Sequence, residues 1–356
     1  MTPGTDLIIL ASWNPYNSET LGRQITLQKE RAWSIDNDIP WKMGVDVHKF
    51  LLPLDDDAVA FPGATDQQRL ALSQLMGLII NATIAEMETS LKTLRRDAWE
   101  LVLDSYPVNQ EMRELGELFF VEELKHAQAF ARYNTHFCRS MGILEQDLNM
   151  LLPKAFGSNF LSRIVANAKA GGHSFWWVVA QVEEVSIKIF QNIDRDRSDI
   201  DPLYFNVHRL HLEEEARHAN YAFLMLELIR ERDRIKGGGI RGWMHRKSNL
   251  IQAELWTSGW VLSELAKVYE VEHLQHKHPF FATLASALPI LRKHSMNELF
   301  KKLFVRSPYV SLVLNIGNHK KSLKMAQRLG AWRMPLPTPD PKKTNTKSRS
   351  KWDQAS

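Results

Sequence analysis

The chain has 356 residues, of which 44% are hydrophobic and 24% are charged, so it is long and apolar enough to bury a sizeable core. Its single cysteine, Cys138, excludes an internal disulfide and favours a reducing compartment. No uninterrupted run approaches the roughly 18 apolar residues of a spanning helix, and LIILA near the start is too short for a secretory core. We therefore predict a cytoplasmic protein without a membrane segment.

The net charge of +4 lies in the last residues of the chain. After Pro341 there are five cationic residues and only Asp353 to oppose them, which leaves the rest of the chain formally neutral. Such a polar terminus is typical of a solvated tail, and a nucleic-acid reader would carry a basic face on its folded part. We predict a single domain over residues 1–335, a disordered basic tail over 336–356, and no nucleic-acid partner.

The first 66 residues show no long helical periodicity and mix Pro, Asp and aromatic residues, which indicates an irregular lead-in. Its large apolar side chains should pack against the outside of the domain, since they seldom stay in water. They are Trp33, Ile35, Ile39 and Trp41. His48 and the run 55–57 are expected at the surface.

Four long helices are predicted next, in two antiparallel pairs. The first runs from 66 to about 103, with Asp66 as its candidate N-cap, and Pro107 separates it from a second helix over about 111–141. A third follows over about 160–193, with a possible bend at Gly171 and Gly172, and a fourth over about 203–236. Residues 240 to 330 are again helical in period, so the fold class is all-α, with a core bundle over 66–236 and buttressing helices over 240–330.

Two copies of a Glu-x-x-His motif stand on the second and fourth helices, at Glu123–His126 and Glu215–His218. Each pair is one helical turn apart, which is the unit that dimetal carboxylate bundles use together with one further Glu from each of two other helices. His211 lies within about 60° of Glu215 and His218 around the fourth helix and could add a third imidazole. His208 falls near the same face, and either residue could instead be a hydrogen-bonded core histidine.

The two further carboxylates can be sought by counting residues from each connecting turn, because ligands on paired helices must lie at the same height. Glu215 lies 16 residues after Asp199 and Glu184 lies 15 before it, so we predict Glu184 on the third helix. On the first helix we choose Glu88 over Glu86, because Glu88 lies on the apolar stripe, where a carboxylate needs neutralisation.

Other conspicuous groups have simpler interpretations. The aromatic run 175–177 is expected to be core packing, and several histidines are expected to be surface groups or to lie behind the ligands. These histidines are His136, His173, His273, His276 and His278.

The complete pattern resembles the para-aminobenzoate N-oxygenase family of non-haem di-iron enzymes over roughly residues 30–300. It consists of Glu88, Glu123, His126, Glu184, His211, Glu215 and His218. The histidine four residues before the last Glu is the specific feature, since ordinary ferritin-like sites lack it. The resemblance implies a ferritin-like four-helix bundle with flanking helices, and a cytoplasmic homodimer that converts an amine, often an arylamine, to hydroxylamine, nitroso and nitro products in specialised metabolism.

Oxygen and imidazole ligands favour two iron ions, although manganese accepts similar donors. We expect His126 and His218 to bind one ion each, His211 to add a donor to one of them, and Glu123 and Glu215 to include the bridging carboxylates. Glu88 and Glu184 would be mainly terminal. The monooxygenase would use O2 and an external electron donor, a reductase or ferredoxin, because the sequence carries no nucleotide fingerprint.

Three alternatives remain open from the sequence, of which a radical-generating reductase subunit is the weaker one among the enzymes. The same centre could hydroxylate or desaturate carbon, or the chain could be a ferritin-like metal-binding or storage protein. No motif identifies the substrate; Arg292 is a weak candidate for binding a substrate carboxylate.

Overall fold

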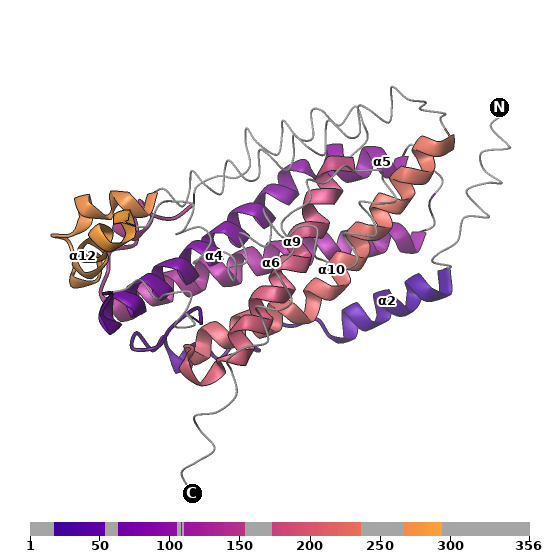
Figure 1. Cartoon of the computed structure of the whole chain (residues 1–356). Helices are drawn as coiled ribbons and strands as arrows, with labels where there is room; N and C mark the ends of the chain where they lie inside the picture. The colour runs from indigo at the N-terminus through magenta and orange to yellow at the C-terminus, as the bar shows by residue number, and fades with distance from the viewer. Residues whose placement is uncertain are drawn as a thin grey trace, which may run out of the picture.

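The computed structural model of the chain describes residues 18–53, 63–104, 108, 110–153, 173–235 and 267–293. Four long helices dominate this part and run side by side in a bundle (Figure 1). They are α4 (Asp66–Arg95), α6 (Gln110–Met141), α9 (His173–Arg195) and α10 (Pro202–Ile235). Within the described ranges there is no strand, only an isolated bridge between Phe50 and Ile200. The all-α prediction is confirmed.

The helices pair as two hairpins, α4 with α6 and α9 with α10, and α6 also contacts α10. The predicted bounds of the second and fourth helices agree with α6 and α10 to within a residue. The first half of the predicted third helix, including Gly171 and Gly172, lies outside the described residues.

The start of α4 differs from the prediction by one residue. Thr65, and not Asp66, is the N-cap, because its hydroxyl accepts a hydrogen bond from the Gln68 backbone while the Gln68 side chain accepts one from the Thr65 backbone. This reciprocal pair is a capping box, which satisfies two backbone donors at the start of the helix.

The far end of α4 passes through a π-helical turn, η2 (Arg96–Glu100), into α5 (Leu101–Asp104). From Asp66 to Asp104 this helix is long and apolar enough to cross a membrane, but 78% of its most apolar window is buried inside the molecule. Such burial identifies the core helix of a bundle and is compatible with a soluble protein.

Helix α2 (Ser18–Glu30) was not predicted; it precedes the bundle and packs on α6. The apolar face of α2 is small, because only Leu21 and Ile25 are buried hydrophobic residues. Contacts with α6 add to it: Gln28 donates to Glu122 at 2.5 Å, and Lys29 pairs with Glu114 at 2.5 Å. The prediction of an irregular lead-in was therefore wrong over these residues.

The segment after α2 behaves as predicted. It holds the short helix η1 (Trp41–Met43), and Trp33, Ile39 and Trp41 are buried against the bundle while Ile35 is partly buried. His48 is exposed, and residues 55–57 lie outside the described part.

Shorter helices complete the described part. They are α7 (Glu145–Leu148), η5 (Arg197–Asp199), η6 (Lys267–Leu274) and α12 (Pro279–Lys293). Helix α12 packs on η6 and α4, as expected of a buttress, although most of the predicted 240–330 region and the whole tail lie outside the described residues.

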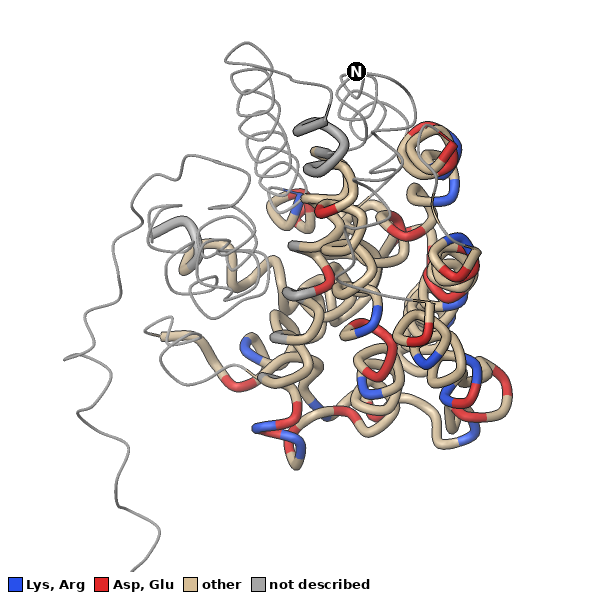
Figure 2. The backbone as a smooth tube through the Cα atoms, turned by 90° about the vertical axis from the view of Figure 1, so that its right-hand side faces the viewer, with Lys and Arg blue, Asp and Glu red and all other residues tan. Residues whose placement is uncertain are grey.

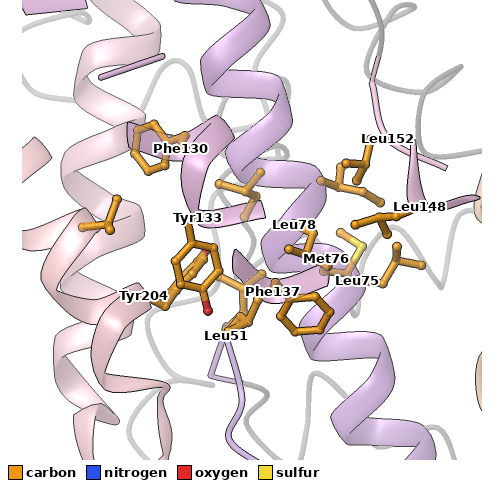
Figure 3. Packing of buried hydrophobic residues seen from close by; sticks show 14 of the residues in the cluster. Leu51, Leu75, Met76, Leu78, Phe130, Tyr133, Phe137, Leu148, Leu152 and Tyr204 are labelled. Atoms are coloured by element: carbon orange, nitrogen blue, oxygen red, sulfur yellow. The ribbon is translucent and has the colours of Figure 1, made fainter. Parts of the chain in front are cut away.

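The buried apolar side chains form two clusters along the bundle. One is built around Phe130, Tyr133 and Phe137 of α6 with Tyr204 of α10 (Figure 3), and the other around Phe119. On each of the four long helices one cluster gives way to the other, between Ile84 and Met87 on α4 and over about two turns on α6, α9 and α10. The polar groups described next occupy this seam.

Candidate metal centre

Buried carboxylates and imidazoles from all four long helices meet at the seam. Each of them is at most 6% exposed. They are Glu88 of α4, Glu123 and His126 of α6, Glu183 of α9, and His211, Glu215 and His218 of α10. Burying so many ionisable groups is costly unless opposite charge compensates them.

Two overlapping sets of donors are close enough to hold metal ions. Glu88, His126, His211 and Glu215 form one set, and Glu123 and His218 join His126 and Glu215 in the other. Within each set the donor atoms lie within 4.8 Å of one another. Because the sets share two residues, they describe two adjacent ion positions rather than two separate sites.

The distances show that Glu215 stands between the two positions. Its Oε1 lies 2.9 Å from Nε2 of His211, 3.3 Å from Nδ1 of His126 and 3.4 Å from Nδ1 of His218. Oε1 of Glu88 is 3.3 Å from Nε2 of His211, and Oε1 of Glu123 is 2.8 Å from Nδ1 of His218.

Several of these atoms are fully buried and lack a well-aligned hydrogen bond, although some of them lie within ion-pair distance of one another. They are Oε2 of Glu88, Oε1 of Glu123, Oε1 of Glu215, and Nδ1 of His126 and His218. Buried polar atoms without a well-aligned hydrogen bond are rare, and oxygen and imidazole donors that converge in this way suit metal coordination. The residues therefore fit a pair of divalent cations.

Electrostatics supports the same interpretation. Burial raises the pKa of Glu88 well above its ordinary value and also raises the pKa of Glu123. Burial would also raise the pKa of Glu215, but the charge of His211 and hydrogen bonds from Glu183 and His211 hold it well below the ordinary value. In the metal-free protein, protons supply part of the positive charge that bound cations would otherwise provide.

The three imidazoles of the centre differ in the direction in which their pKa is shifted. Burial, helped by the charge of His211, lowers the pKa of His126 well below its ordinary value, so this ring is neutral. Burial works in the same direction on His211, but Glu215 and Glu88 raise its pKa to about 10. The pKa of His218 is also raised, by Glu123 and Glu122 against the effect of burial.

Each of the two Glu-x-x-His motifs is preceded by one more Glu. The side chain of that Glu contacts the motif histidine of the other helix. Glu214 of α10 lies 2.7 Å from Nε2 of His126, and Glu122 of α6 lies 2.8 Å from Nε2 of His218. A carboxylate at Nε2 fixes that proton and turns the Nδ1 lone pair inward, which is how outer carboxylates orient metal-binding histidines. We call these two contacts the crossed braces.

The braces are themselves supported. Lys125 donates to Glu214 at 2.7 Å, and Gln28 of α2 donates to Glu122. Lys125 also lies over the ring of Trp33, with Nζ 4.1 Å from its centroid, and Trp33 stacks on His126 with centroids 5.7 Å apart.

Sequence reasoning missed Glu122, Glu214 and Glu183. Glu183 hydrogen-bonds to Glu215, and burial raises its pKa well above the ordinary value. The signal for it was present, since it lies 16 residues before Asp199, as far as Glu215 lies after it. The side chain of Glu184 lies outside the described part of the structure, so its role stays a prediction.

The other histidines considered in the sequence analysis lie in different surroundings. His208 is a core histidine, because it is buried and its Nε2 lies 3.0 Å from the Asn81 side-chain oxygen. His136 is half-buried and stacks on Trp41, and His273 and His276 are exposed.

His278 is half-buried, and its ring nitrogen accepts a hydrogen bond from the Phe280 backbone near the start of α12. The side chains of His173 and Arg292 are not among those described.

Two more expectations can be compared with the described residues. The aromatic run 175–177 is core packing, as predicted, since its three rings are at most 1% exposed. Positive and negative residues are interspersed over the described backbone (Figure 2), and the absence of a nucleic-acid partner stays a prediction.

Comparison with protein-family models gives a match. The family model described as "P-aminobenzoate N-oxygenase AurF" matches residues 15–234, which is more than half of the chain and runs from α2 to the end of α10. The match begins earlier and ends sooner than the range of 30–300 expected from the motifs. Neither the curated proteins nor the solved structures contain a significant match. All four ligand helices and both crossed braces lie within the matched range, and the chain belongs to the p-aminobenzoate N-oxygenase family.

Proposed function

We propose that the protein is a di-iron monooxygenase that oxygenates the nitrogen of an amine. The supporting observation is the set of buried, converging carboxylate and imidazole donors from four helices, in a chain that belongs to the p-aminobenzoate N-oxygenase family. In the first step, R–NH2 with O2, two electrons and two protons would give R–NHOH and water.

The ligands divide between two ion positions. Glu88, His126 and His211 would hold one ion, and Glu123, Glu183 and His218 the other, with Glu215 between them. Two iron ions bound there would supply the activation of O2. The chain itself would hold the imidazoles by the crossed braces and exclude water with the two apolar clusters.

The rest of the proposal concerns the protein's surroundings. We expect a reductase or ferredoxin to deliver the electrons, a homodimer to be the working unit, and specialised metabolism in the cytoplasm to be the setting. The competing functions are oxidation at carbon by the same centre, and metal storage.

The test is anaerobic loading of the full chain with Fe(II), followed by O2, a chemical reductant and a panel of arylamines. We expect two irons per chain and hydroxylamine, nitroso or nitro products by mass spectrometry. Products oxygenated only at carbon would favour the hydroxylase, and a growing mineral core without product would favour storage.

A matched pair of variants tests the assignment of the α9 ligand. Glu183→Ala should lower the iron content and abolish product, because it removes a buried carboxylate next to Glu215. Glu184→Ala should retain both iron atoms and activity. The reverse result would return the ligand role to Glu184 and leave Glu183 as a hydrogen-bond partner.

A further inference from the structure

The two crossed braces have supporting partners of different charge. Oε1 of Glu214 accepts a hydrogen bond from the Lys125 ammonium at 2.7 Å and lies 3.7 Å from Nη2 of Arg217. Glu122 accepts its supporting hydrogen bond from the uncharged amide of Gln28, at 2.5 Å. One brace is therefore a carboxylate paired with cations, and the other is a carboxylate held by a neutral group.

The pairing of Lys125 with Glu214 lies where water screens it only weakly. The Glu214 side chain is fully buried and that of Lys125 is 17% exposed. The ring of Trp33, whose centroid lies 4.1 Å from Nζ, adds a cation–π contact that keeps the ammonium in place. The charge of Lys125 also reaches Glu122, but its hydrogen bond goes to Glu214. Lys125 therefore acts chiefly on the brace of His126.

This difference in charge should change how strongly the two histidines bind a metal ion. A carboxylate at the outer nitrogen of an imidazole makes the inner nitrogen a stronger donor. A cation on that carboxylate weakens the effect, because it opposes the transfer of negative charge to the ring. His126, whose brace is paired with Lys125, should therefore be a weaker donor than His218.

The other donors of the centre add to the same difference. Apart from the shared Glu215, the proposed ligands of the His218 position include two carboxylates, and those of the His126 position include one carboxylate and a second imidazole. A divalent cation gains more Coulomb energy from two carboxylates than from one. Both effects favour the His218 position.

We propose that the two ion positions are filled in order, the His218 position first and the His126 position second. Lys125 is the positioning residue that weakens the second, and it acts through Glu214 without touching the ion. Between the two steps the chain holds one tightly bound divalent cation. This inference rests on the proposed function, because it takes the centre to hold two metal ions.

The experiment is a calorimetric titration of the metal-free full chain with Fe(II) under argon. We expect two binding steps whose dissociation constants differ by roughly tenfold or more, the size of effect that groups behind a ligand exert. His126→Ala should lose the weaker step, and His218→Ala should lose the tighter one. Two equal steps, or loss of the tighter step in His126→Ala, would overturn the proposed order.

Exchanging the supporting partners of the braces tests the role of Lys125. Lys125→Gln gives the brace of His126 an amide, and it should tighten the weaker step by roughly tenfold. Gln28→Lys gives the other brace an ammonium, and it should weaken the tighter step. If Lys125→Gln weakens the second step or leaves it unchanged, Lys125 only packs and the proposal fails.

Two control variants separate charge from packing. Lys125→Arg keeps the charge and should keep the two steps as far apart as in the unchanged chain. Lys29→Gln removes an exposed cation that pairs with Glu114 of the same helix, and it should leave both steps unchanged. Equal effects of Lys29→Gln and Lys125→Gln would show that the net charge of the chain, and not the brace, sets the affinity.

These results are separable from the proposed function. Ordered binding that depends on Lys125, in a chain that oxygenates no amine, would support this inference and refute N-oxygenation. Two equal binding steps in a chain that oxygenates amines would do the opposite.

Discussion

Trp33 and Trp41 occupy similar surroundings, yet only one of them touches the metal centre. Each is a buried indole that stacks on a histidine and lies under a cation: Trp33 on His126 under Lys125, and Trp41 on His136 with Arg132 4.3 Å from its ring centroid. His126 is a candidate ligand and His136 is not. Comparing substitutions of the two tryptophans therefore distinguishes the effect of packing from the effect of orienting a ligand.

Trp33→Leu should therefore weaken metal binding by roughly tenfold, the lower end of what loss of a supporting contact behind a ligand costs. The measurement is a titration of the metal-free chain with Fe(II) under argon. Trp41→Leu should cost comparable thermal stability and leave the affinity unchanged. Equal affinity losses in both variants would show that general destabilisation, and not the stacking on His126, is responsible.

Glu88 and Glu86 give a second residue-scale test. Glu88 is 6% exposed and its Oε1 lies 3.3 Å from Nε2 of His211, while Glu86 is only partly buried. We expect Glu88→Ala to retain about one tightly bound iron per chain and to make no product, because one ion loses a ligand. Glu86→Ala should keep both irons, and loss of iron from this variant would contradict the assignment. Iron analysis after gel filtration is the measurement.

At the scale of elements, two glycines in helices differ in how closely other side chains approach them. A Cβ added at Gly77 of α4 would collide with the side chain of Leu51, whereas one added at Gly22 of α2 would meet no atom within 4 Å. The same substitution should therefore have opposite effects on the two helices.

Gly77→Ala should destabilise the protein by about 1–3 kcal/mol, the usual cost of overpacking a core. Gly22→Ala should stabilise it by up to about 1 kcal/mol, because alanine is the better helix former. Urea unfolding followed by circular dichroism checks both values. Stabilisation by Gly77→Ala would mean that Leu51 yields easily and that the contact does not constrain the segment before α4.

The elements that the sequence predicted well are those with strong local signals. Helices α6 and α10 have long amphipathic patterns and clear breakers, and their Glu-x-x-His pairs identify themselves by spacing. Helix α2 was not predicted because its local apolar pattern is weak. It is supported by contacts with α6, about 90 residues away in sequence. The choice between Glu183 and Glu184 depends on the rotation of α9 about its axis, and counting residues from a turn fixes height but not rotation.

At the scale of the whole molecule, Cys138 reports on opening of the core. It lies in α6 at 2% exposure, and burial raises the pKa of its thiol to about 11. The folded protein should therefore hold the thiol protonated and unreactive below that pH, and its stability should decline as the pH rises from about 9 toward 11, where the unfolded thiol ionises and the folded one does not.

We expect iodoacetamide at pH 8 to label native Cys138 far more slowly than urea-unfolded Cys138, since the thiolate is the reactive form. Loading with Fe(II) under argon should slow the labelling further, because a ligand that binds only the folded state stabilises it. Mass spectrometry gives the modified fraction over time. Rapid labelling of the native chain would show that this part of α6 opens locally without loss of the bundle.

The crossed braces also bear on the order in which the molecule is assembled. The carboxylate that orients each Glu-x-x-His imidazole comes from the opposite hairpin, so a chain that has closed only α4 on α6, or only α9 on α10, presents its histidine without a fixed orientation. Such an intermediate holds only part of either donor set. We therefore expect a metal to bind tightly only after both hairpins have docked, which would keep it away from the apolar surfaces of the half-formed protein.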